Sequence, residues 1–389
     1  MRKLLQSQTI ATALAIFSML FGAGNLFYPI MVGVVSGEHT VLGMIGFLLT
    51  AVLLPVVGLV GMILFDGNYR AFFNRLGSVP GALFIGACMI IIGPLIALPR
   101  IITLSHIMMA PFIPEVSGLV FAVIFLGLTF LCAFRENKIV DLLGRVISPL
   151  LLLSLAIIIF KGLIMGNACI ATSKAAFRVF GESFMLGYGT LDLLGGLFFS
   201  SIVLTILKNT AAAHEKTNHR LLAARGLQAG LIGGALLALV YVGLSMLGLY
   251  YGCGLESLDG GQMFREVSFR VLGARGALII GTAVLMACLS TSIALVAVVG
   301  EYLQRTVFCN KITFIHGLII VSVLSIPLAI YGLKAVLALT GGAITFIGYP
   351  ILIVLTLCNI AHKLTGFNPV KVPVALTAVV ATALYIWVL

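Results

Sequence analysis

One acidic residue stands near the centre of a long apolar run and is the first candidate for chemistry. Asp192 lies in GYGTLDLLGG, Gly187 to Gly196, within an apolar stretch over 184–207. A carboxylate there can hold a cation, a proton or an ammonium group, and an ionisable side chain in such a run predicts a functional site. The alternative is a structural partner for Ser, Thr or Arg in the same bundle.

The run that opens the chain is also interrupted. FGAGNLFYP, Phe21 to Pro29, places Gly22, Gly24 and Asn25 inside an apolar stretch over 10–35. A break in a helix leaves amides at the start of one half, which suit a carboxylate, and carbonyls at the end of the other, which suit a cation. Unpaired backbone in lipid costs several kcal/mol per group, so a break predicts a cavity or a ligand. Close helix packing is the alternative reason for the glycines.

Two further groups of polar residues lie in apolar surroundings. Ser290, Thr291 and Ser292 form a hydroxyl cluster in ACLSTSIAL, Ala287 to Leu295, and can supply oxygen ligands to a small cation. Alternatively, such hydroxyls bond back to carbonyls of their own helix. Arg100 ends IIGPLIALPR and either gates a vestibule or extends its charge outward to water.

The elements that position these residues are membrane-spanning helices. Hydrophobic residues make up 61% of the 389 residues and charged residues 9%, against about 25% charged in soluble domains. This composition predicts an all-α polytopic membrane protein with a single transmembrane domain over 1–389. The apolar runs predict about eleven transmembrane helices, at roughly 10–35, 41–64, 81–109, 117–134, 144–166, 184–207, 227–251, 276–300, 312–332, 335–359 and 372–388.

The net charge of +11 is explained by the loops between these spans. More Lys and Arg fall in the loops that are cytoplasmic when the N-terminus is inside, which predicts that orientation in a cytoplasmic (inner) membrane. No nucleic-acid partner is expected. The loops near 167–183 and 252–275 are then external caps over a vestibule. The seven Cys show no CxxC pair and are interpreted as packing residues.

The interrupted spans are the first and the sixth. Two broken helices five spans apart are typical of transporters built from inverted repeats, whose binding site lies at the breaks. The sequence therefore predicts a 5+5 inverted repeat with broken first and sixth helices. The repeats would cover roughly 8–166 and 184–360, with an extra C-terminal helix at 372–388. A zwitterionic amino acid together with sodium would match both kinds of helix end.

These motifs together resemble a known family. FGAGNLFYP, IIGPLIALPR, GYGTLDLLGG and ACLSTSIAL are similar, in order and over nearly the whole chain, to the branched-chain amino acid:cation symporter family of BrnQ type. The resemblance implies a sodium-coupled importer of leucine, isoleucine and valine with a LeuT-like fold. Family members usually have twelve spans and this chain gives eleven, which leaves the oligomeric state open.

The LeuT-like resemblance also implies ligand positions. It implies one sodium site, hereafter the hydroxyl site, formed by the carbonyls of Ser18, Phe21 and Ala287 and the hydroxyls of Ser290 and Thr291. It implies a second sodium site, hereafter the Asn25 site, from the Asn25 side chain, the Leu20 carbonyl and Thr190. Amides around Gly24 and Leu26 would hold the substrate carboxylate. The substrate-binding set is Gly22, Ala23, Gly24, Asn25, Leu26, Gly189, Thr190 and Asp192.

Other readings stay open at this point. Asp192 stands where the LeuT-like pattern has a neutral residue, so it either replaces part of the cation chemistry or pairs with the substrate ammonium. A proton as driver, or a different amino acid, is the alternative within the same fold. An enzyme would need a catalytic cluster at one membrane face, and HEKTNHR, His214 to Arg220, fits a solvated loop better. The sequence predicts a transporter in a lipid bilayer, with Na⁺ as coupling ion and no organic cofactor.

Overall fold

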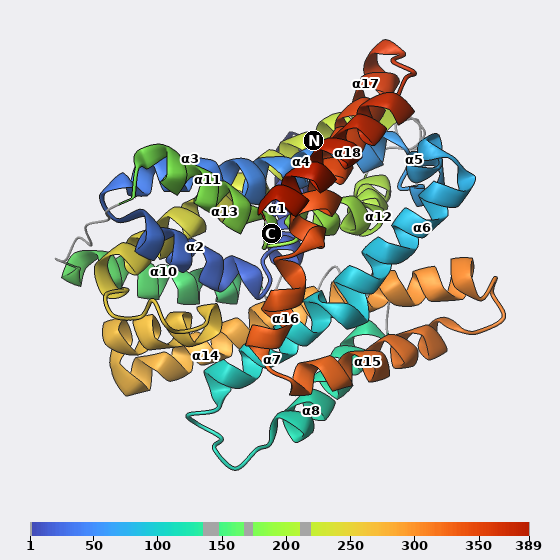
Figure 1. Ribbon diagram of the computed structural model, residues 1–389. Helices are drawn as coiled ribbons and strands as arrows, with labels where there is room; N and C mark the ends of the chain where they lie inside the picture. Colours follow the sequence, from blue (N-terminus) through green and yellow to red (C-terminus); the bar gives the residue numbers. More distant parts are fainter. Residues whose placement is uncertain (1, 135–147, 167–173, 211–218, 389) are drawn as a thin grey trace.

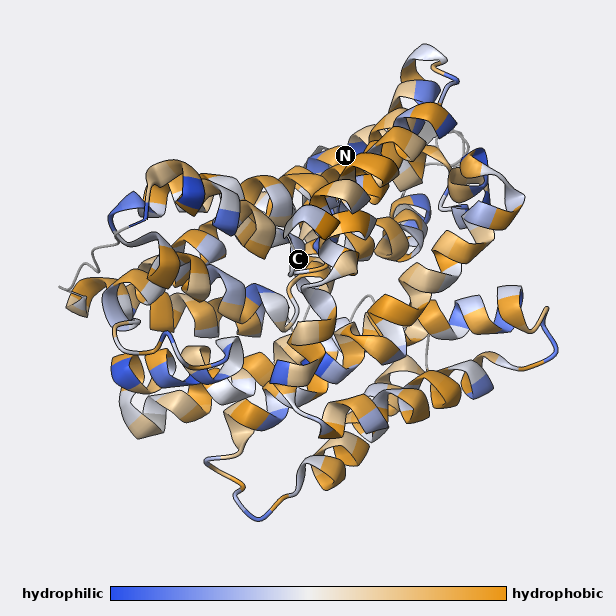
Figure 2. Cartoon of the chain, viewed as in Figure 1, coloured by the Kyte–Doolittle hydropathy of each residue, from blue (hydrophilic) through white to orange (hydrophobic). Residues whose placement is uncertain are grey.

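The computed structural model describes residues 2–134, 148–166, 174–210 and 219–388, and these ranges contain helices and turns but no β-strand (Figure 1). Apolar residues dominate the helices in Figure 2, whereas hydrophilic residues gather mostly at helix ends and connecting turns. Many large apolar side chains lie on the outer surface, among them Leu83, Phe160 and Leu239. Such a surface suits lipid rather than water, and the expected all-α class is confirmed.

The helices follow one another along the chain with short connections. In order they are α1 (Arg2–Leu20), α2 (Gly24–Ser36), α3 (Thr40–Leu48), α4 (Leu54–Leu64), α5 (Tyr69–Phe73), α6 (Ser78–Ile90), α7 (Ala97–Met109), α8 (Gly118–Ala133), α10 (Ser148–Met165), α11 (Ala176–Tyr188), α12 (Asp192–Thr210), α13 (His219–Tyr251), α14 (Gly260–Tyr302), α15 (Phe314–Ile330), α16 (Leu333–Thr340), α17 (Tyr349–Thr365) and α18 (Lys371–Val388).

An apolar helix lies at the position of every expected span. Six helical stretches of the described residues are long and apolar enough to cross a membrane, and five shorter apolar helices accompany them. The first long stretch, Gly24–Leu64, joins α2 to α3 and α4 through a turn at Gly37, where φ is +49°. This stretch covers the end of the first expected span and all of the second, so the long helical stretches do not match the expected spans one to one. Residues 144–147 of the fifth expected span lie outside the described residues, as does most of HEKTNHR.

Two segments expected as external loops are partly helical, which corrects the sequence interpretation. α11 begins at Ala176 rather than 184, and α14 begins at Gly260, inside the expected loop 252–275. The Asp259 side chain caps α14 by accepting from the Gln262 amide at 2.9 Å. Charged residues near these helix starts end the apolar runs early, so a search for apolar runs misses the first turns.

The first expected span is broken at the predicted place. α1 ends at Leu20 and α2 begins at Gly24. Between them the Gly22 amide turns back to the Leu20 carbonyl at 2.9 Å, a contact that does not continue the helix. The first turn of a helix leaves its amides without intrahelical acceptors, so the start of α2 offers free donors beside the carbonyls that end α1.

The sixth expected span is broken in the same way. α11 ends at Tyr188 and α12 begins at Asp192. Leu191, just before α12, has φ of +65°, a left-handed conformation that costs a residue with a side chain about 1–2 kcal/mol. Asp192 then occupies the first turn of α12, where the positive end of the helix dipole favours its negative charge. Both predicted breaks are confirmed.

Glycines let four segments of the bundle approach each other backbone to backbone. A Cβ on Gly33 of α2 would overlap the Ser245 carbonyl of α13, and one on Gly248 of α13 would overlap the Ile30 carbonyl of α2. α12 and α4 meet likewise, where a Cβ on Gly196 would overlap the Pro55 carbonyl. Small residues at helix interfaces permit this close approach and the dispersion contacts that come with it.

The third expected span is kinked at Gly93, about two helical turns before Arg100. Gly93 has non-helical φ and ψ of −91° and −118°, and Pro94 follows it without an N–H to donate. α7 then starts at Ala97, and Arg100 lies in its first turn. The kink directs the start of α7 toward the two breaks, which brings a cationic side chain beside them.

Candidate functional site

A buried polar cluster joins the first break, the sixth break and α13. The Asn25 side-chain nitrogen donates to an Asp192 carboxylate oxygen at 2.6 Å and to the Leu20 carbonyl at 3.0 Å. It also contacts the Tyr241 hydroxyl, which itself donates to the same Asp192 oxygen at 3.2 Å. Asp192 is 5% exposed, so its charge depends on these partners.

The residues expected in the Asn25 site are thus brought together. Thr190 completes the group, since its hydroxyl accepts from the Asp192 amide at 3.4 Å and donates to the Gly187 carbonyl at 2.9 Å. Tyr241 was missed by sequence reasoning, because a single Tyr in an apolar helix carries no motif. The Asn25 amide nitrogen faces three oxygens but has only two N–H bonds, so this is an oxygen-rich site.

The five groups expected in the hydroxyl site fall into two adjacent sets of contacts, one of which includes a bond from Ser290 back to its own helix. The Ser290 hydroxyl lies 3.1 Å from the Ser18 carbonyl and 2.7 Å from the Ala287 carbonyl. The Thr291 hydroxyl lies 3.2 Å from the Phe21 carbonyl. These oxygens come from the end of α1 and the middle of α14, and the carbonyls at the break lack the helical partners that a continuous helix would give them.

Ser292 faces away from this site despite its place in the same cluster. Its hydroxyl contacts the Thr129 hydroxyl of α8 at 2.9 Å and the Leu289 carbonyl. With 3.6 residues per turn, Ser290 and Ser292 point to nearly opposite sides of α14. The hydroxyl cluster therefore divides into two members that face α1 and one that ties α14 to α8.

Arg100 is buried against the sixth break and does not extend toward water. It is 4% exposed, and its guanidinium donates to the Gly189 carbonyl at 2.5 Å and the Thr190 carbonyl at 2.8 Å. A Cβ on Gly24 would lie 3.2 Å from one guanidinium nitrogen, so the side chain also packs on the start of α2. The snorkelling interpretation of Arg100 is wrong, because the nearby carbonyls attract the cation inward.

The cavity at the centre of these residues is small. It has a volume of about 30 Å³ and touches Gly22, Ala23, Asn25, Arg100 and Asp192 among others. That is room for about two water molecules, so side chains or helices must move before a larger molecule enters. Of the expected substrate set, Gly24, Leu26 and Gly189 do not line it; the Leu26 amide donates to the Ala23 carbonyl at 3.3 Å.

Larger hollows lie at both ends of this central site. One, the vestibule, measures about 760 Å³ and lies between α2, α11 and the segment after α16. Tyr28 and Gly189 line it, and a Cβ on Gly189 would come within 2.5 Å of the Tyr28 hydroxyl. Tyr28 thus closes the vestibule over the sixth break. The other hollow, of about 400 Å³, lies at the far end of α12, where Lys208 pairs with Asp66 at 2.6 Å.

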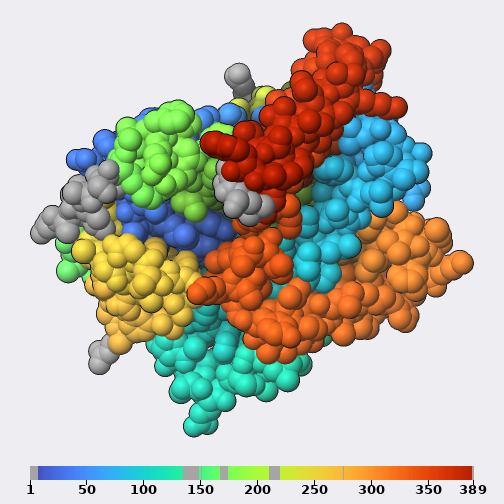
Figure 3. Space-filling model, viewed as in Figure 1, coloured from blue at the N-terminus to red at the C-terminus, as the bar shows by residue number. Residues whose placement is uncertain are grey.

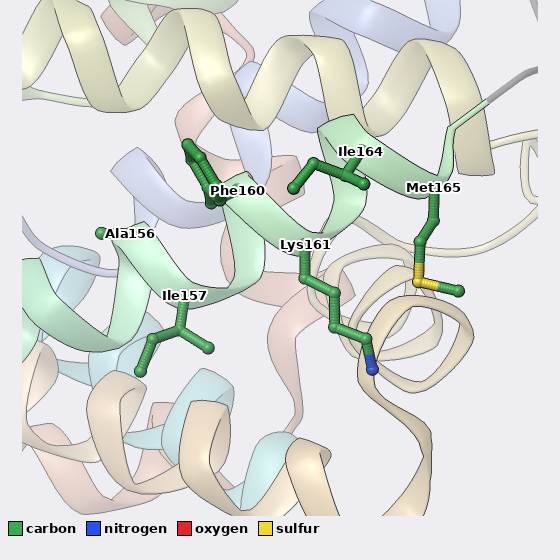
Figure 4. Close-up of a pocket in the computed structure, with 6 residues that line it drawn as sticks. All are labelled: Ala156, Ile157, Phe160, Lys161, Ile164 and Met165. Atoms are coloured by element: carbon green, nitrogen blue, oxygen red, sulfur yellow. The ribbon is translucent and has the colours of Figure 1, made fainter.

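Two further hollows are on the outer surface. One of about 530 Å³ is lined by six residues that all belong to α10, whose side chains spread from one helix without converging (Figure 4). Lys161 is the one charged residue among them. Another, of about 560 Å³, is an apolar groove beside α18, which lies across the face of the molecule shown in Figure 3. Neither brings reactive groups together, so the site lies at the breaks.

Comparison with known proteins decides what kind of protein carries this site. A family model described as branched-chain amino acid transport protein matches residues 5–388. The chain belongs to the branched-chain amino acid transport protein family. The branched-chain amino acid permease BraB of Bacillus subtilis strain 168 is 30% identical over 365 residues, which cover 92% of this chain and 80% of BraB. The permease BrnQ of Salmonella typhimurium is 30% identical over 305 residues, covering 76% and 68%.

A solved structure of another family shares the fold of this chain. Mhp1, a nucleobase-cation-symport-1 family transporter, superposes with a TM-score of 0.61 at 15% identity, covering 98% of this chain and 92% of Mhp1. The LeuT-like fold implied by the sequence is therefore confirmed. Members of the branched-chain amino acid transport protein family are transporters, so a multi-pass membrane transporter rather than an enzyme is confirmed as well.

Proposed function

We propose that the protein is a sodium-coupled symporter that imports leucine, isoleucine and valine across the cytoplasmic (inner) membrane by alternating access. The substrate class is supported by the names of its relatives, which are branched-chain amino acid permeases. The observation that carries sodium coupling is the hydroxyl site. Two neighbouring hydroxyls of α14 lie within hydrogen-bond distance of carbonyls there, Ser290 of the Ser18 and Ala287 carbonyls and Thr291 of the Phe21 carbonyl.

Sodium at the hydroxyl site would replace hydrogen bonds that the protein now makes to itself. The hydroxyls of Ser290 and Thr291 would turn their lone pairs to the ion, and the carbonyls of Ser18 and Phe21 would keep an electrostatic partner. Because one wall is α1 and the other is α14, bound sodium would hold the two helices together. The ion is thereby linked to the position of the first break.

The Asn25 site is proposed to bind a second sodium. Flipping the Asn25 side-chain amide would exchange its nitrogen for its oxygen. That oxygen would then lie beside the Leu20 carbonyl, Asp192 and the Tyr241 hydroxyl. Four oxygens would then face one point, one of them a full negative charge. Thr190 would add its hydroxyl from the sixth break.

The substrate is proposed to lie between the two breaks. Its ammonium would pair with Asp192, and its carboxylate would meet the amides around Gly24 and Leu26. The aliphatic side chain would contact the apolar wall of the cavity, which includes Ile101, Phe199 and Leu295. An apolar pocket separates side chains by about 1–3 kcal/mol per methylene, so leucine, isoleucine and valine should compete with one another.

The arrangement in the membrane follows from the same proposal. With the N-terminus inside, the vestibule lined by Tyr28 would open outward and the hollow at Lys208 would open to the cytoplasm. The two repeats would cover roughly 8–166 and 184–360. Arg100 would act as a gate, because it ties α7 to the sixth break.

Uptake of radiolabelled leucine into proteoliposomes tests the proposal. An inward sodium gradient is compared with choline at the same ionic strength and pH, and excess isoleucine, valine or lysine is added. We expect uptake that requires sodium and is blocked by isoleucine and valine but not by lysine. Uptake unchanged in choline would remove the sodium claim, and no leucine uptake by folded protein would remove the substrate claim.

A proton as the driving ion is the second candidate, and Asp192 is the observation that favours it. Its buried carboxylate is joined to Asn25 and Tyr241 at the crossing of three helices, where a proton can replace a metal cation. This version predicts uptake in choline that responds to a pH gradient and is lost in Asp192→Asn.

A further inference from the structure

Arg100 has a buried N–H donor that its contacts with Gly189, Thr190 and Tyr28 do not use. A guanidinium has five N–H bonds, and Arg100 uses its two terminal nitrogens to donate to Gly189 and Thr190. The Nε atom is buried and has no hydrogen-bond partner among the described residues. A buried N–H without an acceptor is costly, so this atom points to a ligand.

The surroundings of that free donor attract an anion. Arg100 packs against Gly24, the first residue of α2, and the Gly24 and Asn25 amides precede the first hydrogen bond of that helix, which the Leu26 amide makes to the Ala23 carbonyl. The guanidinium cation and the partly positive N-terminus of α2 repel each other, and an anion bound between them would remove that repulsion. Arg100 and the first break also line the same small cavity, together with Asp192.

The two buried charges of the cavity have different hydrogen-bond partners. Asp192 receives hydrogen bonds from Asn25 and Tyr241, whereas Arg100 donates to backbone carbonyls. A cavity with one fixed cation and one fixed anion is complementary to a zwitterion, which carries one charge of each sign. An amino acid would place its carboxylate at Arg100 and its ammonium at Asp192.

We propose that Arg100 binds the α-carboxylate of the substrate, together with the first amides of α2. The Nε–H and the second hydrogen of one terminal nitrogen would form the side-on, two-bond contact that guanidinium makes with carboxylate. The other bonds to Gly189 and Thr190 would orient the fork. This inference rests on the proposed function, and it makes Arg100 a specificity-determining residue for the carboxylate rather than a gate alone.

Ligand titration of purified protein in sodium buffer tests the proposal. Leucine is compared with leucinamide, which keeps the ammonium and the side chain but lacks the carboxylate. Wild-type protein should prefer leucine. In Arg100→Met the affinity for leucine should fall about 10- to 100-fold while that for leucinamide changes little, because one ion-assisted contact is lost. Arg100→Lys keeps the charge without the planar fork and should give an intermediate preference.

Arg75→Met is the matched control. Arg75 also donates to side-chain and backbone oxygens, at 3.0 Å to Asn359 and 3.1 Å to the Asn368 carbonyl, but far along the chain from the breaks. The Arg75→Met variant should prefer leucine over leucinamide to the same extent as wild type. An equal loss of leucine and leucinamide in Arg100→Met would overturn the proposal, because Arg100 would then only hold the breaks in place. If Arg100→Met does not fold, an unchanged preference in Arg100→Lys would overturn it.

The outcome also separates this inference from the proposed function. If wild-type protein binds neither leucine nor leucinamide, the substrate claim fails first. If wild type binds leucine and the Arg100 variants keep its preference, the substrate claim stands and the role of Arg100 falls.

Discussion

Removing one hydroxyl from α14 should weaken sodium binding without unfolding the protein. In Ser290→Ala and Thr291→Ala, the variant loses one of the five oxygens expected in the hydroxyl site, and the carbonyls of Ser18 or Phe21 lose their partner. A hydrogen bond or ligand contact with a charged group is worth about 1.5–3 kcal/mol. At about 1.4 kcal/mol per tenfold change, each variant should need roughly 10- to 100-fold more sodium.

The assay measures leucine uptake against sodium concentration, with choline keeping the ionic strength constant. The quantity compared is the sodium concentration at half-maximal uptake. Ser292→Ala is the matched control, since it removes a buried hydroxyl two residues further along α14 that faces Thr129 instead of α1. Its sodium requirement should match wild type, and Thr291→Ser, which keeps the hydroxyl, should come close to it.

Two results would refute this reasoning. Equal shifts in Ser290→Ala and Ser292→Ala would mean that loss of packing, not loss of a ligand, changes the sodium requirement. A changed leucine requirement at saturating sodium, with the sodium requirement unaltered, would assign these hydroxyls to the substrate. The double variant should lose less than the sum of the two, because both hydroxyls act on one ion.

Three further outcomes follow from contacts at the breaks and in the bundle. Gly189→Ala should abolish uptake, because its Cβ would come within 2.5 Å of the Tyr28 hydroxyl, and Tyr28→Ala should restore part of it. Tyr241→Phe leaves the buried Asp192 with one donor fewer, so uptake should need about tenfold more sodium, and the free energy of unfolding should fall by about 1–3 kcal/mol. Gly248→Ala should lower the free energy of unfolding by about 1–3 kcal/mol, measured by thermal unfolding in detergent, since its Cβ overlaps an α2 carbonyl.

The sequence predicts those parts of the site that are formed by the backbone at the two helix breaks. Glycines with a polar residue in an apolar run identify both breaks, because lipid forbids such a break without a partner. The hydroxyl site is anticipated in another way. The sequence itself shows the hydroxyl cluster on α14, and the LeuT-like resemblance implies the carbonyls that complete the site near the first break and one turn earlier on α14.

Contacts between distant helices are what the sequence does not predict. Tyr241 reaches Asp192 only because α13 packs on α2, and an isolated Tyr in an apolar helix looks like any packing residue. The partners of Arg100 depend on the kink before α7, which sets the direction of the side chain. The start of α11 is missed because Arg178 and Glu182 face the vestibule and interrupt the apolar pattern.

The glycine contacts of the bundle decide which parts of the protein can separate. α2 and α13, and likewise α4 and α12, touch through backbone atoms at their glycines, and no ion or substrate is proposed to replace those glycine contacts, so each pair should move as one rigid body. The contacts from α7 and α14 to the breaks are of another kind. They are hydrogen bonds from Arg100, Ser290 and Thr291 to backbone carbonyls, and an ion or a substrate can substitute for each. The helices therefore separate along the same contacts at which the ion and the substrate are proposed to bind. Whether those sites are occupied should then set how readily α7 and α14 move away from the breaks.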